Sequence, residues 1–187
     1  MSAMKPWFLR GKVIHGFGRG GTQLGYPTAN MELNDAAVEF LKQFDNQVLW
    51  GWGCVEAASA AEHADAAVRA AAPAELGPFP FAMSIGNNPQ FKNVAISAEV
   101  YFLHKFPADF YDCNVRILTL EKIRLQAAFT TLEDLIKTID GDIHFTNEHL
   151  KLPQWVSYEH HKMVSPTVTP TELGLREGVP SFGFLDA

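Results

Sequence analysis

Ile96-Ser97-Ala98-Glu99-Val100-Tyr101-Phe102-Leu103-His104 is a run in which apolar and polar side chains largely alternate. In an extended chain every second side chain points to the same side. One side then carries Ser97, Glu99, Tyr101 and Leu103, and the other carries Ile96, Ala98, Val100 and Phe102. Because the second side is entirely apolar, the run predicts a β-strand that covers a core with one face.

Four other segments are rich in β-branched and aromatic residues and are separated by Asn, Pro, Gly and Asp: residues 8–15, 48–56, 81–85 and 115–124. Such segments favour strands, and the residues between them favour turns. Five or so strands without regular intervening helices are typical of a closed or nearly closed antiparallel sheet. The chain is therefore predicted to be mainly β, with a barrel as its centre.

Two helices are predicted beside the strands. Residues 34–44 favour a short helix with Asn34 or Asp35 as its N-cap. Residues 130–143 change to a helical period, because large apolar side chains recur every three or four positions, at Leu132, Leu135, Ile136 and Ile139. This amphipathic helix is expected to pack on the barrel, and Asp142 near its end is interpreted as a turn or cap residue.

Composition limits the class of protein. With 187 residues, 47% of them hydrophobic, the chain is long enough for one domain with its own core. A net charge of −6 and the absence of a Lys/Arg cluster argue against nucleic-acid binding. No apolar run is long enough to span a membrane, so a cytoplasmic protein is expected. Cys54 and Cys113 are interpreted as free, packed thiols.

The chain is predicted to divide near residue 155. Residues 1–155 form the barrel domain, with an Ala-rich insertion near residues 57–74 that is interpreted as a surface loop or marginal helix. Residues 156–187 form a polar C-terminal tail that Pro and Gly interrupt. Phe182 and Phe184 are the side chains expected to attach this tail to the domain.

A glycine-rich loop, Gly16-Phe17-Gly18-Arg19-Gly20-Gly21, follows the first strand. It contains GxGxxG, but Gly25 and Pro27 follow too closely for the helix that a dinucleotide-binding fingerprint requires. A Walker loop is absent from the sequence. Two interpretations stay open, namely a loop whose amides approach phosphates and a plain connection between strands.

Thr28, Asn30 and Glu99 carry oxygen atoms suited to phosphoryl transfer. In extended chain Thr28 and Asn30 point the same way, and their oxygens are hard ligands for Mg²⁺. The alternative is that both residues cap a turn. Glu99 either lies on a solvated face or lines a site, in which case it is a natural general base for an attacking alcohol.

Three segments together resemble the riboflavin kinase family, in its monofunctional eukaryotic form. The first spans residues 11–30 and ends in Pro27-Thr28-Ala29-Asn30. The second begins with Ser84-Ile85-Gly86-Asn87-Asn88-Pro89 and continues to Glu99 and Asp109-Phe110-Tyr111, and the third runs from Ile123-Arg124 to residue 143. The resemblance implies a six-stranded antiparallel Greek-key β-barrel with a C-terminal helix.

The resemblance also implies the reaction and the roles of individual residues. Members of the family transfer the γ-phosphate of ATP to the ribityl 5′-hydroxyl of riboflavin, giving FMN and ADP. Thr28 and Asn30 would bind ATP and a divalent metal, Mg²⁺ or else Zn²⁺ or Mn²⁺, and Glu99 would be the base. The loop with Gly16, Gly18 and Gly20 would cover the nucleotide, and the flavin would contact Arg124, Phe129 and Leu132. A monomer is expected.

The chain departs from the family pattern at three positions. Asn87 stands where an aromatic is frequent, Tyr101 where histidine is common, and Asp112 where glycine often follows Asp-Phe-Tyr. None of the three is a residue to which the resemblance assigns chemistry. Two other functions stay open at this point: a flavin- or nucleotide-binding module that has lost the reaction, and a non-enzymatic barrel that binds proteins.

Overall fold

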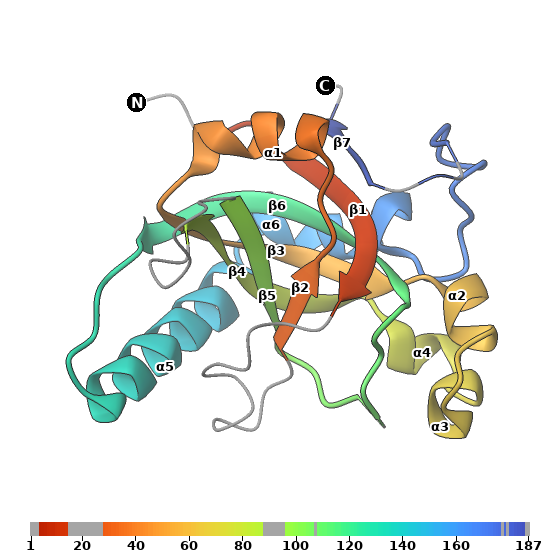
Figure 1. Cartoon of the computed structure of the whole chain (residues 1–187), viewed down its shortest axis with the longest axis horizontal. Coiled ribbons are helices and arrows are strands. Elements are labelled where there is room, and N and C mark those ends of the chain that lie inside the picture. Colours follow the sequence, from red (N-terminus) through yellow and green to blue (C-terminus); the bar gives the residue numbers. More distant parts are fainter. Residues whose placement is uncertain are drawn as a thin grey trace.

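The computed structural model describes residues 4–14, 28–87, 96–106, 108–176, 178 and 180–185. Six antiparallel strands close into the predicted barrel (Figure 1). In order around the barrel they are β1 (Trp7–Ile14), β2 (Thr28–Met31), β5 (Ile96–Phe102), β4 (Phe79–Asn87), β3 (Gln47–Val55) and β6 (Asn114–Leu125), and β6 pairs with β1. The glycine-rich loop with Gly16, Gly18 and Gly20 lies outside the described residues.

The part of the chain from residue 153 onward is called the C-terminal segment, and its strand β7 (Ser181–Phe184) extends the sheet as a seventh strand. β1 pairs with β2 only through Val13 and Ile14, so most of that edge is left for another partner. β7 occupies it along Trp7 to Arg10. The two aromatic side chains of β7 also contact Phe40, with ring centroids 4.9 Å away for Phe182 and 5.4 Å for Phe184. Both predicted anchors of the C-terminal segment are confirmed.

Strands β3 and β6 are buried on both faces. Inside the barrel Leu49, Val115 and Ile117 belong to the main core. A second apolar cluster lies on the other face of these strands: Trp50, Trp52, Leu118, Leu120 and Val164. The C-terminal segment covers this cluster with α6 (Pro153–Val156), η3 (Ser157–His160) and η4 (Lys162–Val164). Burial of both faces explains why residues 48–56 are apolar almost without alternation.

The two predicted helices are present, but the second is longer at its C-terminal end than the sequence predicted. Asn34 caps α1 (Asp35–Leu41) by accepting a 2.8 Å hydrogen bond from the Ala37 amide, and η2 (Lys42–Phe44) follows. The amphipathic helix α5 (Leu132–His149) continues beyond the predicted end at residue 143. Its last turns remain helical because Thr146 is buried and Phe145 packs on the second apolar cluster.

The Ala-rich segment folds into three short helices: α2 (Ala57–Ala61), α3 (Ala66–Arg69) and α4 (Pro73–Leu76). Each buries one apolar side chain in the main core, from Ala60, Val68 and Leu76 respectively. These helices and α5 lie at opposite sides of the barrel in Figure 1. Within the described residues no helix is both long and apolar enough to cross a lipid bilayer.

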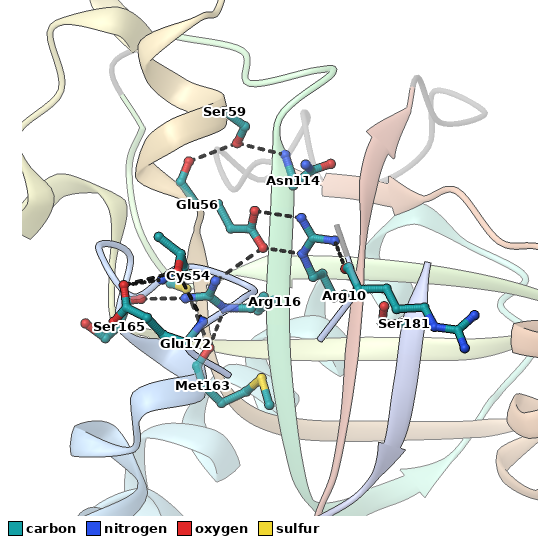
Figure 2. A network of polar contacts seen from close by, with 12 residues as sticks. Arg10, Cys54, Glu56, Ser59, Asn114, Arg116, Met163, Ser165, Glu172 and Ser181 are labelled. Atoms are coloured by element: carbon teal, nitrogen blue, oxygen red, sulfur yellow. Dashed lines mark hydrogen bonds and ion pairs between the residues drawn. The ribbon is translucent and has the colours of Figure 1, made fainter. Parts of the chain in front are cut away.

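A buried ion network joins the C-terminal segment to the barrel (Figure 2). Arg10 on β1 lies directly opposite Arg116 on β6, an arrangement of like charges that is unfavourable by itself. Glu56 is only 4% exposed, and its carboxylate accepts hydrogen bonds from both guanidinium groups. The remaining guanidinium nitrogens donate to backbone carbonyls, those of Met163 (2.8 Å) and Ser165 (2.5 Å) in the case of Arg116.

Both cysteines are free and buried, as predicted. Cys54 lies beside this network, and its Sγ is 3.9 Å from the Met163 carbonyl oxygen. Burial raises the pKa of the Cys54 thiol to about 12 and that of Cys113 to about 11. Both thiols are therefore protonated at neutral pH and act as small apolar packing groups.

Replacing Gly51 with alanine is expected to destabilise the barrel by about 3 kcal/mol, the upper end of the usual cost of overpacking. A Cβ at this position would lie 1.9 Å from the Leu118 carbonyl oxygen, so the β3 and β6 backbones would have to separate. The register of the two strands is already irregular between Trp50 and Gly51. Urea unfolding of the variant and the parent chain measures the difference.

Gly141→Ala is the matched control, because nothing lies within 4 Å of a Cβ at this position of α5. Alanine is favoured over glycine inside a helix by about 0.5–1 kcal/mol, so this variant is expected to be more stable than the parent. Equal stabilities of the two variants would contradict the close approach of β3 and β6 at Gly51.

Candidate functional site

Strand pairing brings the predicted chemical residues together on one face of the sheet. Asn30 on β2 lies directly opposite Glu99 on β5, and Thr28 lies opposite Tyr101. Directly paired residues point to the same face of an antiparallel sheet. The intervening pair, Ala29 and Val100, is fully buried in the core on the other face. Thr28, Asn30, Glu99 and Tyr101 therefore form a cluster outside the barrel core.

The same face continues onto β4. Ser84 pairs with Glu99, and Ala82 pairs with Tyr101. The observed burial along β5 alternates as the sequence predicts, with every second residue buried from Ile96 to Phe102. The other residues, Glu99 and Tyr101 among them, are partly exposed. The carboxylate is thus neither in the core nor on a fully solvated surface.

A pocket of about 390 Å³ lies beside this cluster, within the size range of small-molecule sites. It lies between the sheet face, the segment of residues 126–129 and α5. Its apolar lining includes Val48, Ala82, Phe129, Leu135 and Ile139, and its polar lining includes Ser84, Tyr101, Arg124, Gln126 and Asp142. A mostly apolar pocket with a few polar groups suits a ring system that carries hydrogen-bonding atoms.

Arg124 and Asp142 form a two-pronged ion pair in the pocket wall. Arg124 Nε and Nη2 each donate to one Asp142 carboxylate oxygen at 2.7 Å. Asp142 is only 6% exposed, so its interpretation as a turn or cap residue is wrong. The reason is the length of α5, which places Asp142 inside the helix, on the buried side with Ile139 and Thr146. This pair fixes the Arg124 guanidinium and joins β6 to the helix.

Gln126 holds the segment that follows β6 against the sheet. Its Nε2 donates to Ser84 Oγ at 2.5 Å, and its backbone amide donates to the Asn46 carbonyl at 2.9 Å. A Cβ at Gly86 would lie 2.3 Å from Gln126 Oε1, so glycine is what allows this side chain to sit there. The sequence carries no signal that would have identified Gln126, because its partners are distant in the chain.

The structure brings most of the predicted site residues together. Thr28, Asn30 and Glu99 form the cluster on β2 and β5, while Arg124 and Phe129 line the adjoining pocket. Leu132 is 55% exposed and does not belong to the pocket lining, whereas Leu135, one helical turn later, does. Tyr101 was singled out from the sequence only as a departure from the family pattern.

The cluster fits a hard divalent cation. Thr28 and Asn30 present a hydroxyl and a carboxamide oxygen from one extended strand, with the Glu99 carboxylate opposite Asn30. Mg²⁺ takes oxygen ligands and few of them from protein when phosphates are present. Among the described residues there is no group of three or more His, Cys, Asp and Glu side chains that could hold a metal instead.

A barrel face with hydroxyl, carboxamide and carboxylate oxygens beside a mostly apolar pocket is the arrangement expected of an enzyme that acts on a small molecule. The sequence model of the riboflavin kinase (flavokinase) family matches residues 3–150. The chain belongs to the riboflavin kinase family. Members of this family are ATP-dependent kinases.

Individual riboflavin kinases are similar to this chain in sequence and structure. The riboflavin kinase of Pyricularia oryzae is 37% identical over 151 residues, which cover 81% of this chain and 74% of the relative. The riboflavin kinase of Homo sapiens is 33% identical over 150 residues, which cover 80% and 84% respectively. The crystal structure of riboflavin kinase from Trypanosoma brucei superposes on this chain with a TM-score of 0.71 and 34% sequence identity. The match covers 98% of this chain and 96% of the Trypanosoma brucei chain.

Proposed function

We propose that this chain is a riboflavin kinase that transfers the γ-phosphate of ATP to the ribityl 5′-hydroxyl of riboflavin, with Glu99 as the general base. The reaction products are FMN and ADP. Family membership supports the overall reaction. The observation that carries the assignment of residues is the pairing of Asn30 with Glu99, next to Thr28 and to an apolar pocket that suits a flavin ring.

The proposed arrangement of substrates follows the chemistry of the two halves of the site. The isoalloxazine ring lies in the apolar pocket against Phe129 and Arg124, and Leu132, exposed at the start of α5, is also assigned to the flavin. The ribityl chain then runs across the β4 and β5 face toward Glu99. Thr28 and Asn30 bind the ATP phosphates together with the cation. The loop with Gly16, Gly18 and Gly20, outside the described residues, is assigned to cover the nucleotide.

Catalysis in this arrangement consists mainly of alignment. The oxygen of the riboflavin 5′-hydroxyl forms a bond to the γ-phosphorus while the bond from that phosphorus to the ADP oxygen breaks. Glu99 accepts the proton that this hydroxyl loses. A divalent cation, Mg²⁺ or else Zn²⁺ or Mn²⁺, supplies charge neutralisation on the phosphate oxygens when bound. Thr28 and Asn30 orient the phosphates, and the pocket walls orient the flavin. Fixing both partners removes much of the entropic barrier.

Product formation tests the proposal. Purified protein is mixed with riboflavin, ATP and Mg²⁺, and riboflavin and FMN are separated by chromatography and measured by fluorescence. FMN is expected to appear, and EDTA is expected to stop its formation. If riboflavin binds but no FMN forms with Mg²⁺, Zn²⁺ or Mn²⁺, the chain is a flavin-binding module and not a kinase.

We also propose that the chain acts as a monomer, because the cluster and the pocket are built from one chain. Sedimentation equilibrium is expected to give the mass of a single chain, 20.7 kDa, at concentrations used for the assay. A stable mass of two chains would contradict this.

Arg124→Lys is expected to weaken riboflavin binding about tenfold. Lysine keeps the positive charge but loses the planar fork that pairs with both Asp142 oxygens, so the pocket wall between β6 and α5 is no longer fixed. The dissociation constant is measured from the quenching of riboflavin fluorescence. Arg69→Lys, an exposed change on α3, is the control and is expected to leave the constant unchanged. Equal constants for both variants would show that the fork does not shape the site.

A further inference from the structure

Ser84 lies between the pocket and the proposed base. It lines the pocket from β4, and strand pairing places it directly opposite Glu99 on β5. Directly paired residues of an antiparallel sheet share one face, with their Cβ atoms about 5 Å apart. A chain that joins a ring in the pocket to a hydroxyl group at Glu99 therefore passes the Ser84 side chain.

Gln126 fixes the Ser84 hydroxyl group. Gln126 Nε2 donates to Ser84 Oγ at 2.5 Å, and the Gln126 main chain is itself held by the Asn46 carbonyl at 2.9 Å. Because Oγ is the acceptor in this bond, the Ser84 hydroxyl hydrogen is left to donate to another group. Neither side chain makes a further hydrogen bond within the described part of the chain, so the Gln126 carboxamide also keeps one N–H and its oxygen for a ligand.

The charged residues of the pocket lining offer much less to a ligand. Arg124 Nε and Nη2 donate to Asp142, and Arg124 Nη1 donates to the Leu125 carbonyl at 2.9 Å. These groups largely satisfy one another. Ser84 and Gln126 together present donors and an acceptor, and each hydroxyl of a sugar alcohol both donates and accepts. The pair therefore suits a polyol chain better than it suits an apolar one.

We infer that Ser84, oriented by Gln126, is a specificity-determining residue that binds the ribityl chain and selects flavins with a hydroxylated side chain. This inference rests on the proposed function. A flavin whose chain lacks these hydroxyls would displace water from Ser84 and Gln126 without replacing its hydrogen bonds. Polar groups left without partners in this way make a site reject the analogue.

An analogue of riboflavin with a 5-hydroxypentyl chain tests the inference, because it keeps the ring and the terminal hydroxyl but lacks the other three. In the parent chain kcat/KM for riboflavin is expected to exceed that for the analogue by about 10². Ser84→Ala is expected to lower kcat/KM about tenfold for riboflavin and less than twofold for the analogue. An equal loss for both substrates, or no loss for either, would overturn the inference, because a residue that only shapes the site acts on both.

Gly86→Ala reaches the same pair by another route. A Cβ at Gly86 would lie 2.3 Å from Gln126 Oε1, so the Gln126 side chain has to leave Ser84. The preference for riboflavin over the analogue is expected to narrow as it does in Ser84→Ala, and an unchanged preference would overturn the role of Gln126. Ser97→Ala is the matched control, since Ser97 is paired with Gly86 on the next strand but does not line the pocket. Both of its kcat/KM values are expected to equal those of the parent.

Binding without ATP separates this inference from the proposed function. The dissociation constants of riboflavin and the analogue are measured by quenching of flavin fluorescence, and the preference for riboflavin is expected to shrink about tenfold in Ser84→Ala. If the parent forms no FMN but shows this Ser84-dependent preference, the kinase reaction fails and the recognition of the chain stands. If the parent phosphorylates both flavins with equal kcat/KM, the inference fails and the proposed function stands.

Discussion

Glu99→Gln is expected to lower kcat by about 10² or more, the range for loss of a general base, with riboflavin binding nearly unchanged. Glutamine has the shape of glutamate but does not accept the proton of the attacking hydroxyl. The pocket proposed to hold the flavin keeps its walls, since they come from other side chains, among them Phe129, Leu135 and Ile139. Single-turnover formation of FMN gives the rate, and fluorescence quenching gives the binding constant.

Glu39→Gln is the matched control for this change. Glu39 lies on α1, pairs with the exposed Lys42 and does not line the pocket, so the same chemical replacement is made outside it. Its kcat is expected to equal that of the parent chain. A fully active Glu99→Gln variant would remove Glu99 from the mechanism, and a variant that no longer binds riboflavin would assign Glu99 to binding and not to proton transfer.

Glu56→Ala is expected to destabilise the protein by about 3–5 kcal/mol, the usual cost of removing one partner of a buried ion pair. The Arg10 and Arg116 side chains are 3% and 0% exposed and lie opposite each other, so the loss of Glu56 leaves two adjacent buried cations without their common anion. Part of this penalty is expected to be relieved by release of the C-terminal segment, whose carbonyls these arginines bind.

Chemical denaturation measures the free energy of unfolding. Amide hydrogen exchange at residues 163–166 and in β7 shows whether the C-terminal segment is released from the barrel. The control is Glu39→Ala, which removes an exposed carboxylate and is expected to change stability by less than about 0.5 kcal/mol. A loss below about 1 kcal/mol for Glu56→Ala would mean that water reaches the two arginines. The pocket lined by Arg124 and Phe129 includes none of these three residues, so kcat of the folded variant is expected to be retained.

The C-terminal segment shows where composition misleads. Its Pro, Gly and polar residues predict an irregular tail, and most of the segment is indeed irregular. Yet Met163 and Val164 are buried, and β7 completes an edge of the sheet. Besides side-chain packing, main chain attaches the segment, because Arg10 and Arg116 donate to its carbonyl groups. Every residue has a carbonyl, so this attachment leaves no pattern in the sequence.

The sequence by itself determined the local features of this protein. The alternation of residues 96–102 gave both faces of β5, and the spacing of Leu132, Leu135 and Ile139 gave the helix, because side-chain direction follows from position within one element. Short motifs such as Pro27-Thr28-Ala29-Asn30 indicated the family. They also led to the prediction that Thr28, Asn30 and Glu99 are site residues. In each case the information lies within a few consecutive residues.

Only the tertiary structure decided which of these side chains meet. The row of Asn30, Glu99 and Ser84 depends on the order of β2, β5 and β4, and the pairing of Arg124 with Asp142 depends on where α5 docks. These arrangements join residues far apart in the chain, and the packing of the whole core fixes them, so no single stretch of sequence specifies them.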